Sequence, residues 1–142
     1  IGGGASNCIS ELGICATIGG GFNNCADSSN ATVGGGLANL ASGAYSMVGG
    51  GYNNCAVGAR SIIAGGFQNC AIASTSTVGG GESNYTIGYF STIGGGHLNI
   101  ASGDYSIIGG GSLNVVSGLG SSVVGGFNNN VSSNYGIIGG GV

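Results

Sequence analysis

Residues 91–105 read Ser-Thr-Ile-Gly-Gly-Gly-His-Leu-Asn-Ile-Ala-Ser-Gly-Asp-Tyr, and variants of this 15-residue stretch run through the whole chain. We number each copy from the aliphatic residue before its glycine cluster, Ile93 in this copy, as position 1. That position is always Ile or Val: Ile1, Ile18, Val33, Val48, Ile63, Val78, Ile93, Ile108, Val123 and Ile138. The first copy is slightly longer than the others, and every later copy has the same 15-residue length.

This constant period predicts one repeat array, because each unit of such an array buries surface only against its neighbours. The array covers residues 1–142, with an irregular first coil over 1–17, regular coils over 18–137 and a partial coil over 138–142. Since the chain opens and closes inside its own motif, we expect it to be a segment of a longer chain.

The repeat is too short for a helix-turn-helix unit, and its glycine triplets would break a helix. Two short strands and two turns fit its length. We expect one strand over positions 13 to 2 and the other over positions 7 to 10, with turns at the glycines of positions 3, 4 and 11, where positive φ costs glycine nothing. The fold class is therefore all-β, a flattened parallel β-solenoid with position 1 in one vertical file.

Strand alternation places positions 14 and 1 inside each coil and position 15 outside. Position 15 carries Met47, Ile62, Ile107 and Ile137, and position 8 is also mostly apolar. A thin coil cannot bury both sets, and a long exposed apolar stripe marks an interaction surface. We therefore predict that the chain associates with copies of itself.

Charge is nearly absent from this sequence. One basic residue, Arg60, cannot neutralise a phosphate backbone, so nucleic acid is excluded as a partner. No apolar run is long enough to span a membrane. The five charged residues are Glu11, Asp27, Arg60, Glu82 and Asp104. Glu11 belongs to the irregular first copy, and the other four fall at positions 5, 10, 12 and 13, which we expect to face solvent.

The stretch at 91–105 resembles the head repeats of trimeric autotransporter adhesins and kindred repeats of phage and viral tail fibres. The resemblance rests on the Ser-x-Ile/Val-Gly core and on the later Ala and Gly, and it extends over essentially the whole chain. It implies a left-handed β-roll that packs side by side as a homotrimer on a cell surface or virion surface, outside the cell.

Position 7 is Asn in every complete copy. Stacked amides can hydrogen-bond from coil to coil, as in cross-β assemblies, so we predict a structural ladder. Its members in and after the first regular coil are Asn24, Asn39, Asn54, Asn69, Asn84, Asn99, Asn114 and Asn129.

Four of the five cysteines occupy position 8: Cys8, Cys25, Cys55 and Cys70. Leu, Ile, Val and Tyr replace them in other copies, which favours apolar packing. Stacked neighbours have parallel Cβ vectors that suit a disulfide poorly, so a disulfide between chains is the better hypothesis for these four.

Other polar and aromatic residues have structural interpretations. Glu82 and His97 share position 5 in successive copies and predict a surface ion pair. The aromatic residues at positions 5 and 13 either brace the turns or offer stacking platforms for sugars or receptors. Of three sequons, at Asn30, Asn84 and Asn130, we favour Asn30 as a glycosylation site because position 13 should be exposed.

The sequence predicts no catalytic residues, no cofactor and no metal site. The glycine clusters lack the Lys-Ser/Thr of a phosphate loop, and calcium-binding glycine repeats need a nine-residue period with a recurrent Asp. The expected function is a structural or display segment of an extracellular fibre that acts in surface attachment, with a host receptor or glycan as a further partner. A filament without a receptor is the alternative. An ice-binding solenoid is disfavoured because position 15 lacks a regular Thr array.

Overall fold

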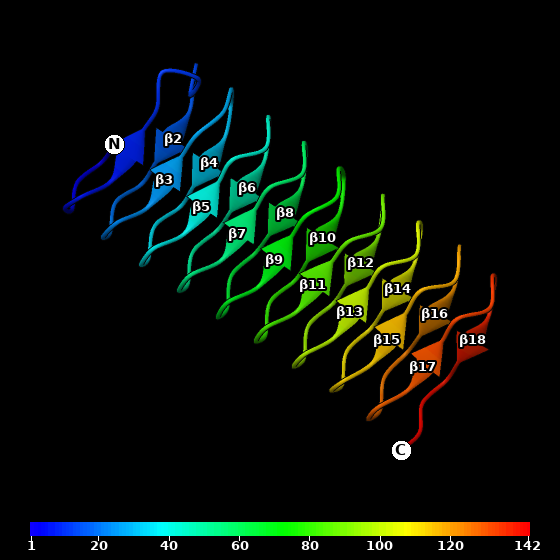
Figure 1. Ribbon diagram of the computed structural model, residues 1–142. Coiled ribbons are helices and arrows are strands. Elements are labelled where there is room, and N and C mark those ends of the chain that lie inside the picture. Colours follow the sequence, from blue (N-terminus) through cyan, green and yellow to red (C-terminus); the bar gives the residue numbers. More distant parts are fainter.

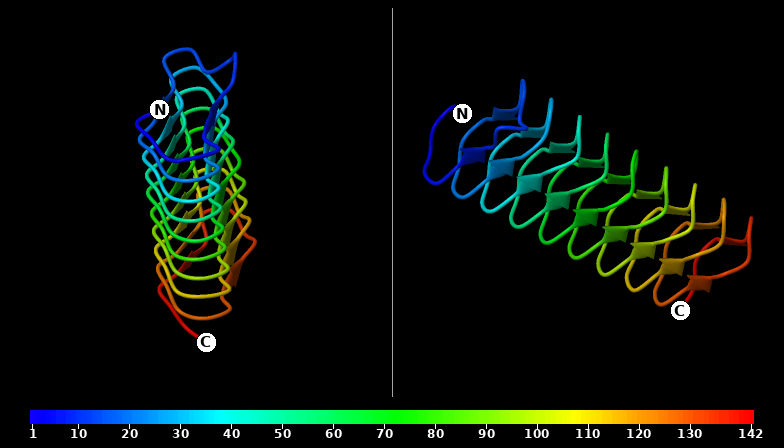
Figure 2. Two further views of the ribbon diagram at one scale, coloured as in Figure 1. Left: turned by 90° about the vertical axis from the view of Figure 1, so that its left-hand side faces the viewer. Right: turned by 45° about the horizontal axis from the view of Figure 1, so that its top comes forward.

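The computed structural model describes residues 1–142 as a slender rod of stacked coils, with the two termini at opposite ends (Figure 1). Each coil contributes two very short strands, and the chain contains no helix. All strand pairs are parallel and pair with the equivalent strand of the next coil, so the chain winds around one long axis (Figure 2). The prediction of an all-β parallel β-solenoid is confirmed.

The odd-numbered strands cover positions 8 and 9 and form one nine-stranded sheet, called here the position-8 sheet. Its strands are β1 Cys8–Ile9, β3 Cys25–Ala26, β5 Leu40–Ala41, β7 Cys55–Ala56, β9 Cys70–Ala71, β11 Tyr85–Thr86, β13 Ile100–Ala101, β15 Val115–Val116 and β17 Asn130–Val131.

The even-numbered strands cover positions 15 and 1 and form the second nine-stranded sheet, called here the position-15 sheet. Its strands are β2 Thr17–Ile18, β4 Thr32–Val33, β6 Met47–Val48, β8 Ile62–Ile63, β10 Thr77–Val78, β12 Thr92–Ile93, β14 Ile107–Ile108, β16 Ser122–Val123 and β18 Ile137–Ile138.

The strands are shorter than the sequence predicts, and the chain turns at positions 6 and 13. Leu98 at position 6 has φ 54°, and Tyr105 at position 13 has φ 56°, both in the left-handed region that a strand cannot include. The same conformation recurs at these positions along the rod. The predicted spans over positions 13 to 2 and 7 to 10 were too long, since the strands cover positions 15 to 1 and 8 to 9.

The glycines of the repeat serve two different purposes. At position 4 the φ angle is positive, as at Gly96 with φ 94°, which matches the prediction of a glycine turn. The prediction was wrong for position 11, which does not have positive φ. A Cβ on Gly103 would lie 2.3 Å from the carbonyl oxygen of Gly118 in the next coil, so close approach between coils explains that glycine.

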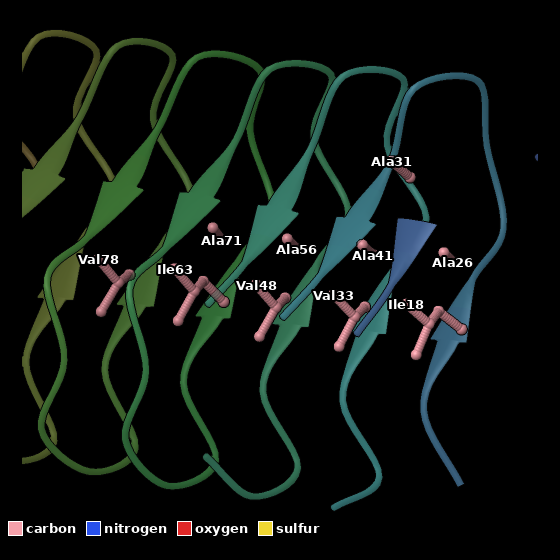
Figure 3. Packing of buried hydrophobic residues seen from close by; sticks show 10 residues of the cluster. All are labelled: Ile18, Ala26, Ala31, Val33, Ala41, Val48, Ala56, Ile63, Ala71 and Val78. Carbon is pink, nitrogen blue, oxygen red and sulfur yellow. The ribbon is translucent and has the colours of Figure 1, made fainter. Parts of the chain in front are cut away.

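The core lies between the two sheets and is one side chain thick on each side (Figure 3). Ile and Val at position 1 point inward from the position-15 sheet, and mostly Ala at position 9 points inward from the position-8 sheet. The predicted vertical file is confirmed and fully buried: Ile18, Val33, Val48, Ile63, Val78, Ile93, Ile108 and Val123.

A polar pair divides this core into two apolar clusters. Thr86 stands where most other coils carry Ala, and its Oγ1 donates a hydrogen bond of 3.0 Å to Ser76 Oγ. Ser76 Oγ in turn donates to the carbonyl oxygen of Ala73 at 2.8 Å. Both buried hydroxyl groups are therefore satisfied, so the interruption leaves no unpaired polar atom here.

Position 14 supplies a matched pair of serines for a stability test. The buried Oγ of Ser106 has no hydrogen-bond partner, whereas Ser91 Oγ, one coil earlier, donates to the Gly88 carbonyl at 2.7 Å. We expect Ser106→Ala to leave the free energy of unfolding unchanged or to raise it by up to about 1 kcal/mol, because an unpaired buried hydroxyl is removed.

The control Ser91→Ala should instead lower the free energy of unfolding by about 1 kcal/mol, because a made hydrogen bond is lost. Urea denaturation of both variants measures the difference. Equal destabilisation by the two substitutions would mean that the Ser106 hydroxyl is bonded in solution.

Candidate functional site

The asparagines of position 7 form one continuous file inside the rod. Asn99 shows the pattern: its Nδ2 donates to Asn84 Oδ1 at 3.1 Å, and also to the carbonyl oxygens of Gly95 at 3.1 Å and Gly111 at 3.0 Å. Its Oδ1 accepts hydrogen bonds from the backbone N–H and the Nδ2 of Asn114. The same contacts link Asn24, Asn39, Asn54, Asn69, Asn84, Asn99, Asn114 and Asn129, and Asn7 joins the file at its start.

These contacts do more than join amide to amide, as the sequence had suggested. Each side chain also ties the glycine turn of its own coil to the glycine turn of the next coil. Seven members of the file are almost fully buried, from Asn24 to Asn114. With donors and acceptors used internally, the file contributes to the framework rather than to a ligand site.

The cysteines of position 8 lie on the outer side of the position-8 sheet as two separate pairs, and the two members of each pair are on adjacent strands. Cys8 pairs in register with Cys25, and Cys55 pairs in register with Cys70. All four are free thiols in the chain, as is the exposed Cys15, which lies elsewhere in the first coil. The disulfide between chains that the sequence suggests for these four stays a prediction.

The thiols of Cys55 and Cys70 are both half-buried. A hydrogen bond from the Cys70 thiol to the sulfur of Cys55 stabilises the Cys55 thiolate and lowers its pKa to about 7, although burial opposes the shift. The same hydrogen bond, together with burial, raises the pKa of Cys70. The sequence places these residues together, but it gives no sign of this asymmetry.

The outer side of the position-15 sheet carries an apolar file of large side chains among threonines. Met47 and Ile62 are each 39% exposed, and Ile107 is 51% exposed. On the position-8 sheet, position 10 adds Val57, Ile72 and Ile87, which are also exposed. Both sheets therefore present apolar groups to the outside, as expected from the alternation.

Aromatic side chains stack along the two edges of the rod. Phe90 and Tyr105 at position 13 have ring centroids 5.1 Å apart and nearly parallel planes. Tyr52 and Phe67 at position 5 have centroids 5.3 Å apart and tilted planes. All four rings are exposed, so each pair lies in contact between successive coils and leaves ring faces or edges open to solvent.

Comparison with known protein families and with curated proteins finds no match to this chain. The resemblance to adhesin and tail-fibre repeats therefore rests on the repeat pattern alone. No helix of the structure has the length and apolar character needed to cross a membrane.

The remaining polar predictions have mixed outcomes. Glu82 and His97 lie side by side in a parallel bridge, but they form no ion pair, and His97 Nδ1 lies 3.4 Å from Ser112 Oγ instead. The predicted ion pair was wrong because both side chains are exposed, where an ion pair gains little. Asn30 is exposed, as expected for a glycan acceptor, and so is Asn130.

Proposed function

We propose that this solenoid is a structural segment of an extracellular fibre, in which copies of the chain pack side by side along their length. The observation that carries the proposal is the apolar character of the outer side of both sheets. Met47, Ile62 and Ile107 project from one sheet, and Val57 and Ile72 project from the other. Covering these side chains with protein would stabilise an assembly by about 25 cal/mol per Å² of apolar area.

The repeat period supports a second copy as the occupant of these faces. Equivalent side chains recur on the rod at every coil, at the spacing of adjacent β-strands, which is about 4.8 Å. A partner that matches this spacing over many coils must share the same period, and another copy of the chain has it. Near-absence of charge also removes the repulsion that would oppose packing of identical chains.

The internal framework supports a role in reach and rigidity. Hydrogen bonds join successive coils in the strands, and also in the turns, where Phe67 N donates to Gly81 O and Tyr105 N donates to Tyr89 O. The buried asparagine file adds bonds along the rod. A fibre segment of this kind would display attached groups at a distance from a cell or virion surface. The repeat resemblance favours a left-handed trimer, and the exposed aromatic edges offer stacking surfaces for a receptor or glycan.

Replacing the large apolar residues of position 15 should weaken the assembly. The triple variant Met47→Thr, Ile62→Thr, Ile107→Thr carries the residue that Thr77 and Thr92 already place at the same position, so the coil should fold unchanged. Each buried methylene removed costs about 0.8 kcal/mol, so association should weaken by at least about tenfold. Light scattering over a concentration series measures the mass of the particle.

The matched control is Leu98→Asn with Leu113→Asn. These exposed residues lie at position 6, on the edge of the rod, where Asn53 and Asn128 occupy equivalent sites. The control should assemble like the unmodified protein. Dispersed single chains at every concentration, or equal loss of assembly in both variants, would contradict the proposal.

A further inference from the structure

Two thiols that the framework does not need lie side by side on the outer side of the position-8 sheet. Cys55 and Cys70 are partners in the register of β7 and β9, so their backbones are about 4.8 Å apart. In parallel, in-register strands the Cβ atoms are separated by nearly the same distance. A disulfide needs Cβ atoms about 3.8 Å apart and roughly 4.5 Å at most, so the sheet holds this pair too far apart for an easy S–S bond.

We propose that Cys55 and Cys70 together bind one Cu(I) ion as a two-coordinate bis-thiolate. This goes beyond the proposed fibre function, which does not depend on it.

The spacing and the softness of the ligands favour this ion. A zinc–thiolate bond is about 2.3 Å long, and two metal–sulfur bonds of about this length in line span roughly 4.6 Å, close to the separation of the strands. Thiolates are ligands of Cu(I), zinc and iron–sulfur clusters. Structural zinc sites need four ligands, and iron–sulfur clusters usually need four cysteines, whereas Cu(I) accepts two thiolates in line.

The surroundings offer no further ligand that would complete a zinc site. Leu40 and Tyr85 lie on the strands that flank the pair. Val57 and Ile72 follow β7 and β9, two residues after Cys55 and Cys70 in the chain. No group of three His, Cys, Asp or Glu side chains comes together anywhere in the structure. The apolar neighbours also limit the access of water to a bound ion.

Binding requires only loss of protons and no redox change. Two S–Cu bonds form, the ion stays Cu(I), and the two thiol protons pass to the solvent. The thiolate, not the thiol, is the metal-binding form of cysteine, so the bound cation favours ionisation of both Cys55 and Cys70.

Cys8 and Cys25 form a second pair with the same register and provide an internal comparison. Cys8 is exposed at the end of the rod, whereas Cys55 and Cys70 are both half-buried, so water reaches the pair of Cys8 and Cys25 more readily. This pair should bind Cu(I) more weakly than Cys55 and Cys70.

Titration of the reduced protein with Cu(I), without oxygen and against a colorimetric Cu(I) chelator, tests the proposal. One tight equivalent per chain is expected, followed by a weaker one. Cys55→Ser and Cys70→Ser should each weaken the tight site by more than the roughly 10–100-fold cost of losing an outer-shell partner. Cys15→Ser, which removes an isolated thiol, should leave both sites unchanged. X-ray absorption should show two sulfur neighbours at the copper.

Three results would overturn the assignment. The first is unchanged tight binding in Cys55→Ser or Cys70→Ser, and the second is an equal loss in Cys15→Ser. The third is a Cys55–Cys70 disulfide that forms readily in air, because the pair would then not be held apart. The same titration on the variant Met47→Thr, Ile62→Thr, Ile107→Thr tests copper binding independently of assembly. That variant keeps both cysteine pairs, so its Cu(I) affinity should equal that of the unmodified protein.

Discussion

Replacing Asn99 with alanine is expected to lower the free energy of unfolding by roughly 2–5 kcal/mol, since each buried group left unpaired costs about 1–3 kcal/mol. The substitution removes the acceptor of the Asn114 backbone N–H, a bond of 3.0 Å in the interior. It also removes the side-chain donor that bonds the Gly95 carbonyl at 3.1 Å. Chemical denaturation followed by circular dichroism measures the loss.

Ser112→Ala is the control for this prediction. Ser112 lies half-buried at the edge of the rod, and its hydroxyl makes one long contact of 3.4 Å with His97. Its removal should change stability by less than about 0.5 kcal/mol, as is usual for surface substitutions. If both variants unfolded at the same denaturant concentration, the amide file would not be buried and bonded in solution.

Gly96→Ala is expected to cost roughly 2–5 kcal/mol, as the sum of backbone strain and overpacking. Gly96 has φ 94°, which a residue with a Cβ adopts only under strain. Its Cβ would also lie 2.1 Å from the carbonyl oxygen of Gly111 and 2.7 Å from Nδ2 of Asn99. The substitution therefore pushes apart two coils and disturbs the amide file. The loss is measured by thermal and urea unfolding.

The neighbouring Gly95→Ala is the control, because the two glycines belong to the same triplet. At Gly95 the nearest atom to an added Cβ is the Gly80 carbonyl oxygen at 3.9 Å, an ordinary contact. This variant should unfold within about 1 kcal/mol of the unmodified protein, which is the usual scale of a change without a clash. A larger loss at Gly95 than at Gly96 would show that the two turn positions are assigned the wrong way round.

The period of the sequence was sufficient to predict the stacking of the coils and the files at positions 1 and 7. It was not sufficient to predict where the strands end. Tyr105 and Leu98 ordinarily avoid positive φ, yet both adopt it here. In that conformation the N–H of each bonds the preceding coil, Tyr105 to Tyr89 O and Leu98 to Glu82 O, while strand residues such as Ile100 bond the following coil. Contacts between coils therefore override local preference.

The candidate sites were predictable to a smaller extent. The spacing alone predicted that Cys55 lies beside Cys70, because residues at the same position of successive copies lie next to each other when the coils stack. The lowered pKa of Cys55 depends on a hydrogen bond between the two thiols that outweighs the opposing effect of burial, and neither influence is visible in the spacing. Likewise, Glu82 and His97 were correctly placed as neighbours, but adjacency alone does not make two exposed side chains form an ion pair.

The hydrogen bonds between coils, including those of the asparagine file, run along the long axis of the rod, and this has a mechanical consequence. A pulling force applied to the two ends acts on the hydrogen bonds of one terminal coil at a time, so the coils detach one after another. Each coil that detaches would release one full repeat of slack chain. Fully extended, that length is about 50 Å, against the roughly 5 Å that the coil occupied. Under load the segment would thus unfold in steps of nearly equal length, dissipate mechanical energy, and refold coil by coil when the force falls.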